Sequence, residues 1–216
     1  MIIEWMGHSC FKIEEFIETG TKRMILTDPF DEQLRYPFPS ENFDIVTESH
    51  QHFDHNAHRR VKGEFQLVNK AGTYNLTGLT IKGYKTYHDE VEGHKRGENI
   101  VFKFEFKTGI SVLHLGDLGH LPSDELISEI GKVNVVMVPV GGTYTIDYRN
   151  AAEAVKIINA DIIIPMHYKT DYLDFDIDGE ESFINKLGYP VEYVKRLDIN
   201  NSNLSDYSGK LILFRI

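Results

Sequence analysis

At 216 residues, 41% of them hydrophobic and 26% charged, the chain is long enough for one globular domain with a sizeable core. Its formal net charge of −10 at pH 7 argues against a nucleic-acid-binding protein, because neutralising phosphates requires a broad basic surface. No apolar run reaches the roughly 18 residues of a membrane span, no secretory leader is recognisable, and a single cysteine excludes an internal disulfide. We therefore expect a cytoplasmic protein whose residues 1–216 form a single domain.

The first half of the sequence is rich in predicted strands. Short apolar and β-branched runs are separated by turn residues such as Gly7 and Gly20. Within 101–106 apolar residues alternate with charged ones, which predicts a strand exposed on one face. Cys10 lies in an apolar strand pattern and is expected to be a buried structural thiol. The expected strands are 2–5, 10–17, 23–27, 43–47, 65–69, 79–85, 100–106 and 110–116.

Helices enter in the second half of the chain. We expect helices at 122–130, 148–159 and 180–187, the second capped by Asp147 and the third ended by Gly188. Continuous apolar runs predict strands at 135–138, 162–164 and 211–214. The acidic segment 171–180 is poor in core residues and is expected to be a surface loop near the site. Strands mixed with surface helices predict two packed sheets with helices outside them.

The strongest functional signal is the H-x-H-x-D-H motif at residues 50–55, which brings three imidazoles and a carboxylate into one tight loop. Such groups bind zinc at about 2.0–2.2 Å, so this loop can supply ligands to two neighbouring metals. We expect Asp54 to cap a short helix that runs through His58, with His58 exposed. A solvated histidine-rich loop is the alternative, but the buried strand predicted just before the motif favours a metal site.

Three further ligand candidates, His88, Asp117 and His167, each lie just past the end of a predicted apolar strand. Side chains at such positions can converge along one edge of a sheet. His94 is the alternative to His88, although it lies in a charged, glycine-containing loop that favours solvation. His114 falls within a strand and is expected to be a buried, hydrogen-bonded core residue.

Four segments, taken together and in this order, resemble the metallo-β-lactamase superfamily of binuclear metal hydrolases. They are residues 26–30 (LTDPF), the H-x-H-x-D-H loop, residues 115–117 (LGD) and residues 164–168 (IPMHY). The resemblance implies an α+β fold, a four-layer αββα sandwich of two mixed β-sheets flanked by helices. It also implies a metal-dependent hydrolase.

The same resemblance implies which residues hold the metals. One ion is expected to be bound by His50, His52 and His88. The other is expected to be bound by Asp54, His55 and His167, with Asp117 bridging the two ions. We expect two zinc ions per chain, with Mn²⁺ or Fe²⁺ as alternatives. Asp28 is expected to fix a ligand histidine through a hydrogen bond, the alternative being a turn residue before a proline.

A narrower resemblance is to a branch of small zinc-dependent hydrolases that includes L-ascorbate-6-phosphate lactonase-like proteins. It rests on residues 5–11 (WMGHSCF), 116–120 (GDLGH), 141–145 (GGTYT), 165–168 (PMHY) and the loop around His88. His120 and Tyr144 are candidates for donating a proton or hydrogen bond to a developing oxyanion. His8 and Thr143 are candidates for supporting a ligand or contacting the substrate.

The leading functional hypothesis is hydrolysis by a metal-bound hydroxide, with Asp54 and Asp117 holding the nucleophile and accepting its proton. The scissile bond would be an ester, lactone, amide or phosphoester of a small molecule, and the short basic patches at 58–62 and 94–96 suit an anionic one. The alternatives are a di-iron redox protein of the same fold, a nuclease or phosphodiesterase, and a non-enzymatic metal-binding protein. We expect no nucleic-acid or membrane partner, and a homo-oligomer is plausible.

Overall fold

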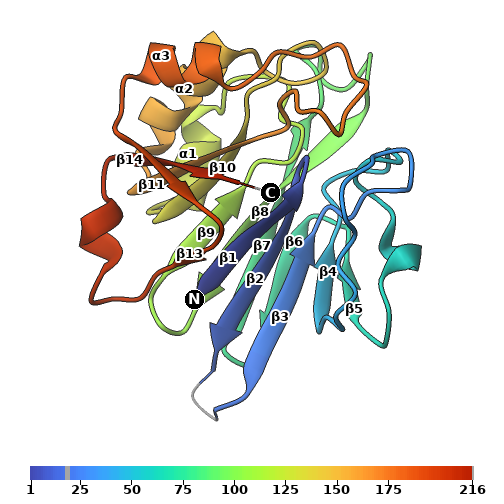
Figure 1. The fold of residues 1–216 in the computed structure, drawn as a ribbon, viewed down its shortest axis with the longest axis vertical. Coiled ribbons are helices and arrows are strands. Elements are labelled where there is room, and N and C mark those ends of the chain that lie inside the picture. Colours follow the sequence, from blue (N-terminus) through green and yellow to red (C-terminus); the bar gives the residue numbers. More distant parts are fainter. Residues whose placement is uncertain (18–19, 216) are drawn as a thin grey trace.

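The computed structural model describes residues 1–17 and 20–215, and its strands form two packed sheets (Figure 1). The first sheet has six strands, in the order β13 (Leu197–Asp198), β1 (Ile2–Gly7), β2 (Cys10–Phe16), β3 (Lys22–Thr27), β4 (Ile45–Thr47) and β5 (Gln66–Val68). The second has eight, in the order β12 (Val191–Val194), β14 (Lys210–Phe214), β11 (Ile162–Met166), β10 (Val135–Pro139), β9 (Ser111–His114), β8 (Glu98–Phe106), β7 (Leu79–Tyr87) and β6 (Gly72–Leu76). Both sheets mix parallel and antiparallel pairs, which confirms the predicted α+β sandwich.

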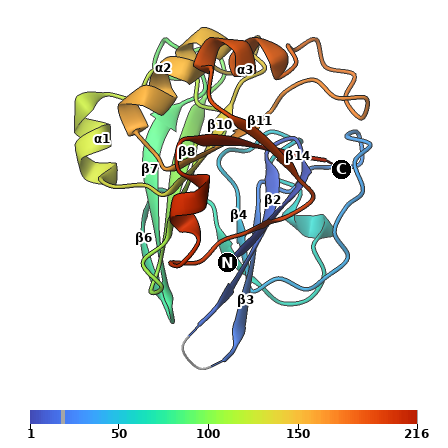
Figure 2. The same ribbon diagram turned by 60° about the vertical axis from the view of Figure 1, so that its left-hand side comes forward.

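The three α-helices lie together on the outer side of the eight-stranded sheet, as the two views in Figures 1 and 2 agree. They are α1 (Asp124–Ile130), α2 (Tyr148–Ile158) and α3 (Glu181–Leu187), close to the predicted ranges. The expected caps are confirmed. The Asp147 side chain accepts hydrogen bonds from the first turn of α2, and Gly188 ends α3 with a φ of 70°.

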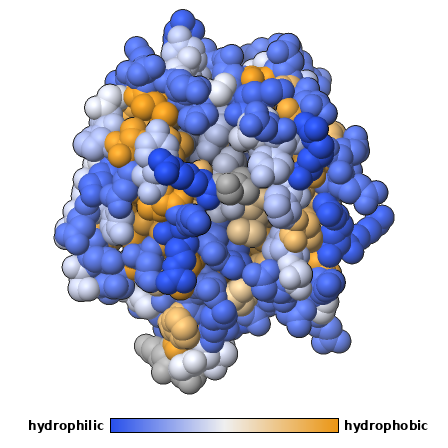
Figure 3. Space-filling model, viewed as in Figure 1, coloured by the Kyte–Doolittle hydropathy of each residue, from blue (hydrophilic) through white to orange (hydrophobic). Residues whose placement is uncertain are grey.

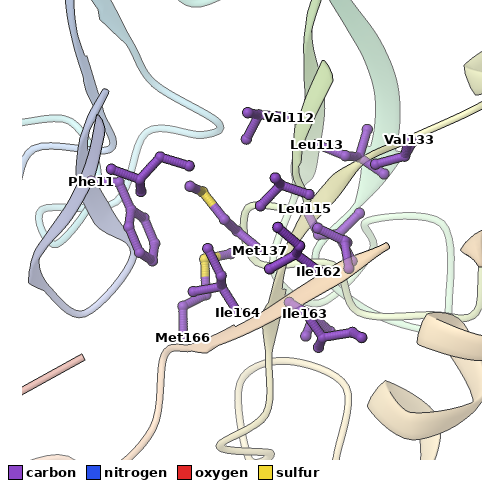
Figure 4. Packing of buried hydrophobic residues seen from close by; sticks show 14 of the residues in the cluster. Phe11, Val112, Leu113, Leu115, Val133, Met137, Ile162, Ile163, Ile164 and Met166 are labelled. Carbon is purple, nitrogen blue, oxygen red and sulfur yellow. The ribbon is translucent and has the colours of Figure 1, made fainter. Parts of the chain in front are cut away.

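One large core fills the space between the sheets and continues beneath the helices. Figure 4 shows Phe11, from β2, facing Met137, Ile164 and Met166 of the opposite sheet. In β10 and β11 every residue is buried, as expected of parallel strands that are covered on both faces. Burial of this core supplies most of the folding free energy.

A second, smaller core lies on the other face of the six-stranded sheet. Neighbouring residues of one strand enter different cores, so that Ile25 packs between the sheets while Leu26 faces outward. The outer residues are covered by Phe30, Tyr36 and other side chains of the irregular segment after β3. This fourth layer is therefore built mostly from irregular chain and a short 3₁₀ helix, η1 (His58–Arg60).

The structure differs from the sequence prediction in several local details. Three of its strands, β6, β12 and β13, were not expected from the sequence. Residues 53–55 form a turn and only η1 follows, so Asp54 does not cap the expected helix. Lys103 is 5% exposed, because α1 covers its face of β8 and the ammonium donates to the Ile130 carbonyl at the end of α1. Segment 171–180 is a loop, as expected, but Leu173 and Ile177 are buried in the smaller core.

Strand direction brings one set of strand ends to a common edge in each sheet. In the six-stranded sheet, β1 and β3 both run antiparallel to β2, and β4 runs parallel to β3. In the eight-stranded sheet, β7 and β9 both run antiparallel to β8, and β10 and β11 run parallel to β9. The residues that follow these strands therefore gather along one edge of each sheet.

Hydrophilic side chains cover most of the face seen in Figure 3, with hydrophobic ones in separate patches. Among the described residues, none of the helices has both the length and the apolar character that crossing a bilayer requires.

Truncating a core ring tests how much the interior contributes. Phe102 is fully buried in β8, so Phe102→Ala should lower the free energy of unfolding by about 3–5 kcal/mol. Phe16, also in a strand, is 59% exposed, and Phe16→Ala should change it by less than about 0.5 kcal/mol. Urea denaturation measures both, and equal losses would contradict the described packing.

Candidate metal centre

The polar residues that follow the co-directional strands meet at one site. Each strand ends, and within a few residues the chain presents a titratable side chain that is almost fully buried. These side chains are His8 after β1, Asp28 after β3, His50 after β4, His88 after β7, Asp117 after β9 and His167 after β11. Both sheets therefore contribute to the site, as the sequence analysis expected for the strand ends.

Their potential ligand atoms fall into compact groups, within each of which all atoms lie within 4.8 Å of one another. One group is His50, His52 and His88. A second is His8, Asp54, His55 and His167. A third, His50, His55 and Asp117, links the first two. The structure thus brings together all seven side chains that the resemblance implied as ligands, and adds His8.

Asp117 lies at the centre of these groups. Its Oδ2 atom is 3.2 Å from Nε2 of His55, 3.2 Å from Nε2 of His88 and 3.1 Å from Nε2 of His167. Burial alone would raise the pKa of this carboxyl, but His167 and His55 beside it hold the pKa well below its usual range. The ionised carboxylate is the form that can share its oxygens between two cations.

A buried network behind the motif orients two of the imidazoles. Asp28 accepts hydrogen bonds from the Ser49 backbone N–H at 2.8 Å, the Ser49 hydroxyl at 2.6 Å and Nδ1 of His55 at 2.9 Å. The Ser49 oxygen in turn accepts from Nδ1 of His50 at 3.0 Å. Because both Nδ1 atoms are occupied in this way, the Nε2 atoms of His50 and His55 are left for the centre.

Several atoms at the centre are buried without a hydrogen-bond partner in the described part of the chain. They are Nε2 of His50, Nε2 of His55, both ring nitrogens of His167, Nδ1 of His88 and Oδ1 of Asp117. Buried polar atoms are rarely left unpaired, so this cluster needs a partner that accepts many lone pairs at once. Burial, followed by the neighbouring His55, also lowers the pKa of His50 well below its ordinary value, favouring the neutral form that binds metal. The residues present fit a pair of divalent cations.

Backbone strain concentrates at this edge of the sandwich. His8, Asp28, Thr143 and His167 have positive φ angles of 54°, 39°, 56° and 52°, although none is a glycine. Gly116, just before Asp117, has a φ of 56°, and an added Cβ would lie 2.3 Å from the Asn99 side-chain oxygen. The surrounding sheets hold these residues in costly conformations, as is common at functional sites.

The remaining predicted site residues differ in their surroundings. His8 is fully buried, with Nε2 3.2 Å from an Asp54 oxygen and its ring 4.1 Å from that of His167. Burial, and then His167, lower the pKa of His8 to about 4. Tyr144 lines the cavity beside the centre, and Thr143 is exposed beside it. His120 is not among the residues that line this cavity.

Both ring nitrogens of His120 contact the backbone. Nε2 accepts from the Tyr87 N–H at 3.3 Å and Nδ1 donates to the Leu121 carbonyl at 2.8 Å. His94 is exposed and lies outside the three groups, whereas His88 belongs to one of them. His114 is buried, donating to the Ser9 carbonyl at 2.8 Å and accepting from the Gly116 N–H at 3.1 Å, as predicted.

Two residues near the motif were not foreseen in their roles. Ser49 links Asp28 to His50, and Glu48 is a fully buried carboxylate that pairs with His58 at 2.5 Å. His58 is therefore half-buried rather than exposed. The available signal was their position between a buried strand and the first ligand. Cys10 is buried, as predicted.

A cavity of about 480 Å³ opens onto the centre, a size typical of small-molecule sites. It gives access to His52, Asp54, His88, Asp117 and His167. The rest of its wall is formed by Gln51, Phe53, Lys95, Arg96, Tyr144 and Phe175.

With this geometry the chain can be compared with known proteins. The model of the beta-lactamase superfamily domain matches residues 2–167. A solved structure from Thermotoga maritima, described as a candidate Zn-dependent hydrolase of the metallo-β-lactamase superfamily, is 41% identical and superposes with a TM-score of 0.81. The similarity covers 99% of this chain and 98% of that one. The chain belongs to the metallo-β-lactamase superfamily.

Other relatives of this chain within the superfamily are named metal-dependent hydrolases. One from Thermoplasma acidophilum is 31% identical over 194 residues, covering 78% of this chain and 83% of the relative. A metallo hydrolase structure from Ignicoccus hospitalis, 24% identical with a TM-score of 0.63 over 87% of this chain and 90% of that one, shares the fold. The superfamily is thus confirmed, while the narrower lactonase-like branch stays a prediction.

The Asp28 network can be tested without metal. Asp28→Asn keeps the shape but removes a charged acceptor from buried Ser49 and His55, and should cost about 1–3 kcal/mol of unfolding free energy. Asp174→Asn is the matched control, because the Asp174 side chain is 89% exposed and pairs only at the surface with Arg35. Urea denaturation in a chelator measures both. Similar values for the two variants would contradict the proposed support of the imidazoles.

Proposed function

We propose that this metal-dependent hydrolase binds two zinc ions per chain and hydrolyses an ester, lactone or phosphoester of a small molecule. The observation that carries the proposal is the position of Asp117, whose Oδ2 lies within 3.2 Å of three imidazole nitrogens from different strand ends. A single buried carboxylate oxygen between two groups of ligand atoms is the arrangement that a pair of bridged metal ions requires.

The donor set favours zinc at both positions. We assign the first ion to His50, His52 and His88, and the second to Asp54, His55 and His167, with Asp117 shared. Imidazole and carboxylate ligands suit zinc, and the adjoining cavity leaves room for a further ligand or substrate. Mn²⁺ and Fe²⁺ accept the same donors and remain alternatives in the test.

When bound, zinc lowers the pKa of a coordinated water to about 7 and polarises a carbonyl or phosphoryl oxygen. The side chains of Asp54 and Asp117 line the cavity and would orient the attacking water, and we assign the acceptance of its proton to Asp54. In an ester the new bond joins the water oxygen to the carbonyl carbon, the bond to the alkoxy oxygen breaks, and the proton passes to that leaving oxygen. The products are a carboxylic acid and an alcohol.

Tyr144 is the better placed of the two predicted hydrogen-bond donors. It lines the cavity and is 39% exposed, and we assign its hydroxyl the donation of a hydrogen bond to a developing oxyanion. His120 has both ring nitrogens engaged by backbone groups, so we assign it a structural role in holding the loops after β7 and β9 together.

The other hypotheses are less well supported. A histidine at position 52 rather than a carboxylate favours zinc over a di-iron redox centre. A net charge of −10 disfavours a nuclease. The accessible cavity beside the ligand groups favours an enzyme over a protein that retains metal for stability alone.

The ligand assignment predicts distinct losses for distinct variants. The purified protein should bind close to two zinc ions per chain, measured by elemental analysis. His52→Ala should lower the number of bound zinc ions, and Asp117→Ala should weaken the binding of both ions. Each should reduce kcat/KM for an activated ester or phosphodiester by roughly a hundredfold or more, because the nucleophile is no longer generated.

His94→Ala is the matched control, since His94 is exposed and lies outside the ligand groups. It should keep wild-type metal content and activity. Full activity of Asp117→Ala, or of the wild type after complete chelation, would refute the mechanism.

A further inference from the structure

We infer that the substrate of this site is an organic anion, whose carboxylate or phosphate group binds Arg96 and whose apolar part packs against Phe53, Tyr144 and Phe175. The inference rests on the proposed hydrolytic function, because the same cavity would hold the reacting bond beside the metal ligands. It adds a substrate class and a specificity-determining residue to that function.

Arg96 is a cation whose charge has no carboxylate partner among the described residues. One terminal nitrogen donates to the Thr143 carbonyl at 2.9 Å, and the guanidinium lies 5.7 Å from the centre of the Tyr144 ring. Its other N–H groups have no hydrogen-bond acceptor within the part of the chain that the structure describes. A guanidinium in a cavity wall can bind a carboxylate or phosphate through two parallel hydrogen bonds.

The neighbouring lysine does not provide the same function. Lys95 also lines the cavity, but its ammonium is exposed and already paired with Glu90. The two carboxylates of the cavity, Asp54 and Asp117, lie deeper and among the imidazoles. Bound metal ions would balance their charge, so they would not repel an anion held at Arg96.

The loop that carries Arg96 is fixed in place by a single buried carboxylate. Asp89, 1% exposed, accepts hydrogen bonds from the backbone N–H groups of Val91 at 2.9 Å and Gly93 at 2.8 Å. Its second oxygen accepts from the N–H groups of Lys95 at 2.9 Å and Arg96 at 2.7 Å. The backbone at Arg96 is therefore fixed before any ligand arrives, and the bond to the Thr143 carbonyl holds the guanidinium, which reduces the entropic cost of binding.

Three aromatic rings line the cavity next to Arg96. Phe175 lies between Tyr144 and Phe53, with ring centres 6.1 Å apart in each pair and edge-to-face angles of 73° and 82°. Tyr144 and Phe53 are 39% and 40% exposed. Phe175 between them is half-buried. A patch of large, partly exposed rings beside a polar site is typical of ligand binding.

Hydrogen bonds to backbone carbonyls hold the loop that carries Phe175. Lys169 donates to the Phe175 carbonyl at 2.6 Å, and Arg35 donates to the Asp171 carbonyl at 3.1 Å earlier in the same loop. A cationic group next to fixed apolar rings, in one cavity of about 480 Å³, matches a molecule that combines an anion with an apolar body.

Binding measurements separate the contribution of Arg96 from that of the metal. The probes are 3-phenylpropionate, 2-phenylethylphosphonate and the neutral 3-phenylpropionamide, titrated by calorimetry into the zinc-loaded full chain. The variants are Arg96→Gln and the control Arg196→Gln, because Arg196 is exposed and pairs with Asp198 away from the cavity. Because zinc itself attracts anions, the quantity to compare between the wild type and each variant is the ratio of anion affinity to amide affinity.

We expect the wild type and Arg196→Gln to bind at least one anion about tenfold more tightly than the amide. Arg96→Gln should remove about tenfold of that anion affinity while the amide affinity changes less than about twofold. The tighter of the two anions identifies the group as carboxylate or phosphate. An unchanged anion-to-amide ratio in Arg96→Gln would overturn the inference.

Phe175 tests the apolar half independently. Phe175→Ala should weaken 3-phenylpropionate about fivefold and leave propionate unchanged, because only the larger probe reaches the ring. Equal effects on both probes would overturn the role of Phe175 in binding the apolar part of the substrate.

The anion site and the proposed hydrolysis can fail separately. If the anions bind in a way that depends on Arg96 but no ester carrying the same anionic and phenyl groups is hydrolysed, the anion site stands and the proposed reaction is rejected. If such an ester is hydrolysed equally well by the wild type and by Arg96→Gln, the proposed reaction stands and the anion site is rejected.

Discussion

A buried carboxylate surrounded by imidazoles is the constraint on which the rest of this structure depends. Asp117 is 2% exposed, and removing an ionised carboxylate from water is costly unless cations or several donors replace the solvent. The chain places the imidazoles of His55, His88 and His167 around one of its oxygens and leaves several of their nitrogens without other partners. Folding of this edge of the sandwich and binding of metal are therefore linked, since metal would satisfy what the protein leaves unpaired.

The two-sheet architecture makes such a centre possible because strand direction, rather than sequence proximity, decides which residues meet. His8 and His167 are far apart in the chain, yet their rings lie 4.1 Å apart because β1 and β11 end at the same side of the sandwich. Both residues have left-handed backbone conformations, which cost about 1–3 kcal/mol each. The extensive core between the sheets offsets that cost, so the interior of the sandwich supplies stability and the strand ends at its edge supply the site geometry.

The parts predicted well from the sequence were those set by local chemistry. Asp147 and Gly188 mark helix ends through their own side chain or lack of one, and the H-x-H-x-D-H spacing brings candidate metal ligands together within one loop. The predictions failed where distant packing decides. The alternating pattern predicts that Lys103 is exposed on its strand. In the structure α1 covers it, and its ammonium donates a hydrogen bond to the Ile130 carbonyl. Leu173 and Ile177 alternate with aspartates in a segment that its acidic composition marked as a surface loop. They become part of a core because the loop folds over the outer face of the six-stranded sheet.

The same distinction separates the residues proposed for catalysis from those proposed for specificity. The residues proposed to hold metal follow strand ends and are buried, so the scaffold fixes their geometry and the sequence reveals them as a pattern. Arg96 and Phe175 lie on loops, fixed by Asp89 and Lys169 rather than by sheet pairing. Loops can change length and side chains without disturbing the strands that end at the proposed metal ligands. The fold alone therefore fixes neither the reaction nor the substrate, and the substrate must be inferred from the individual cavity wall.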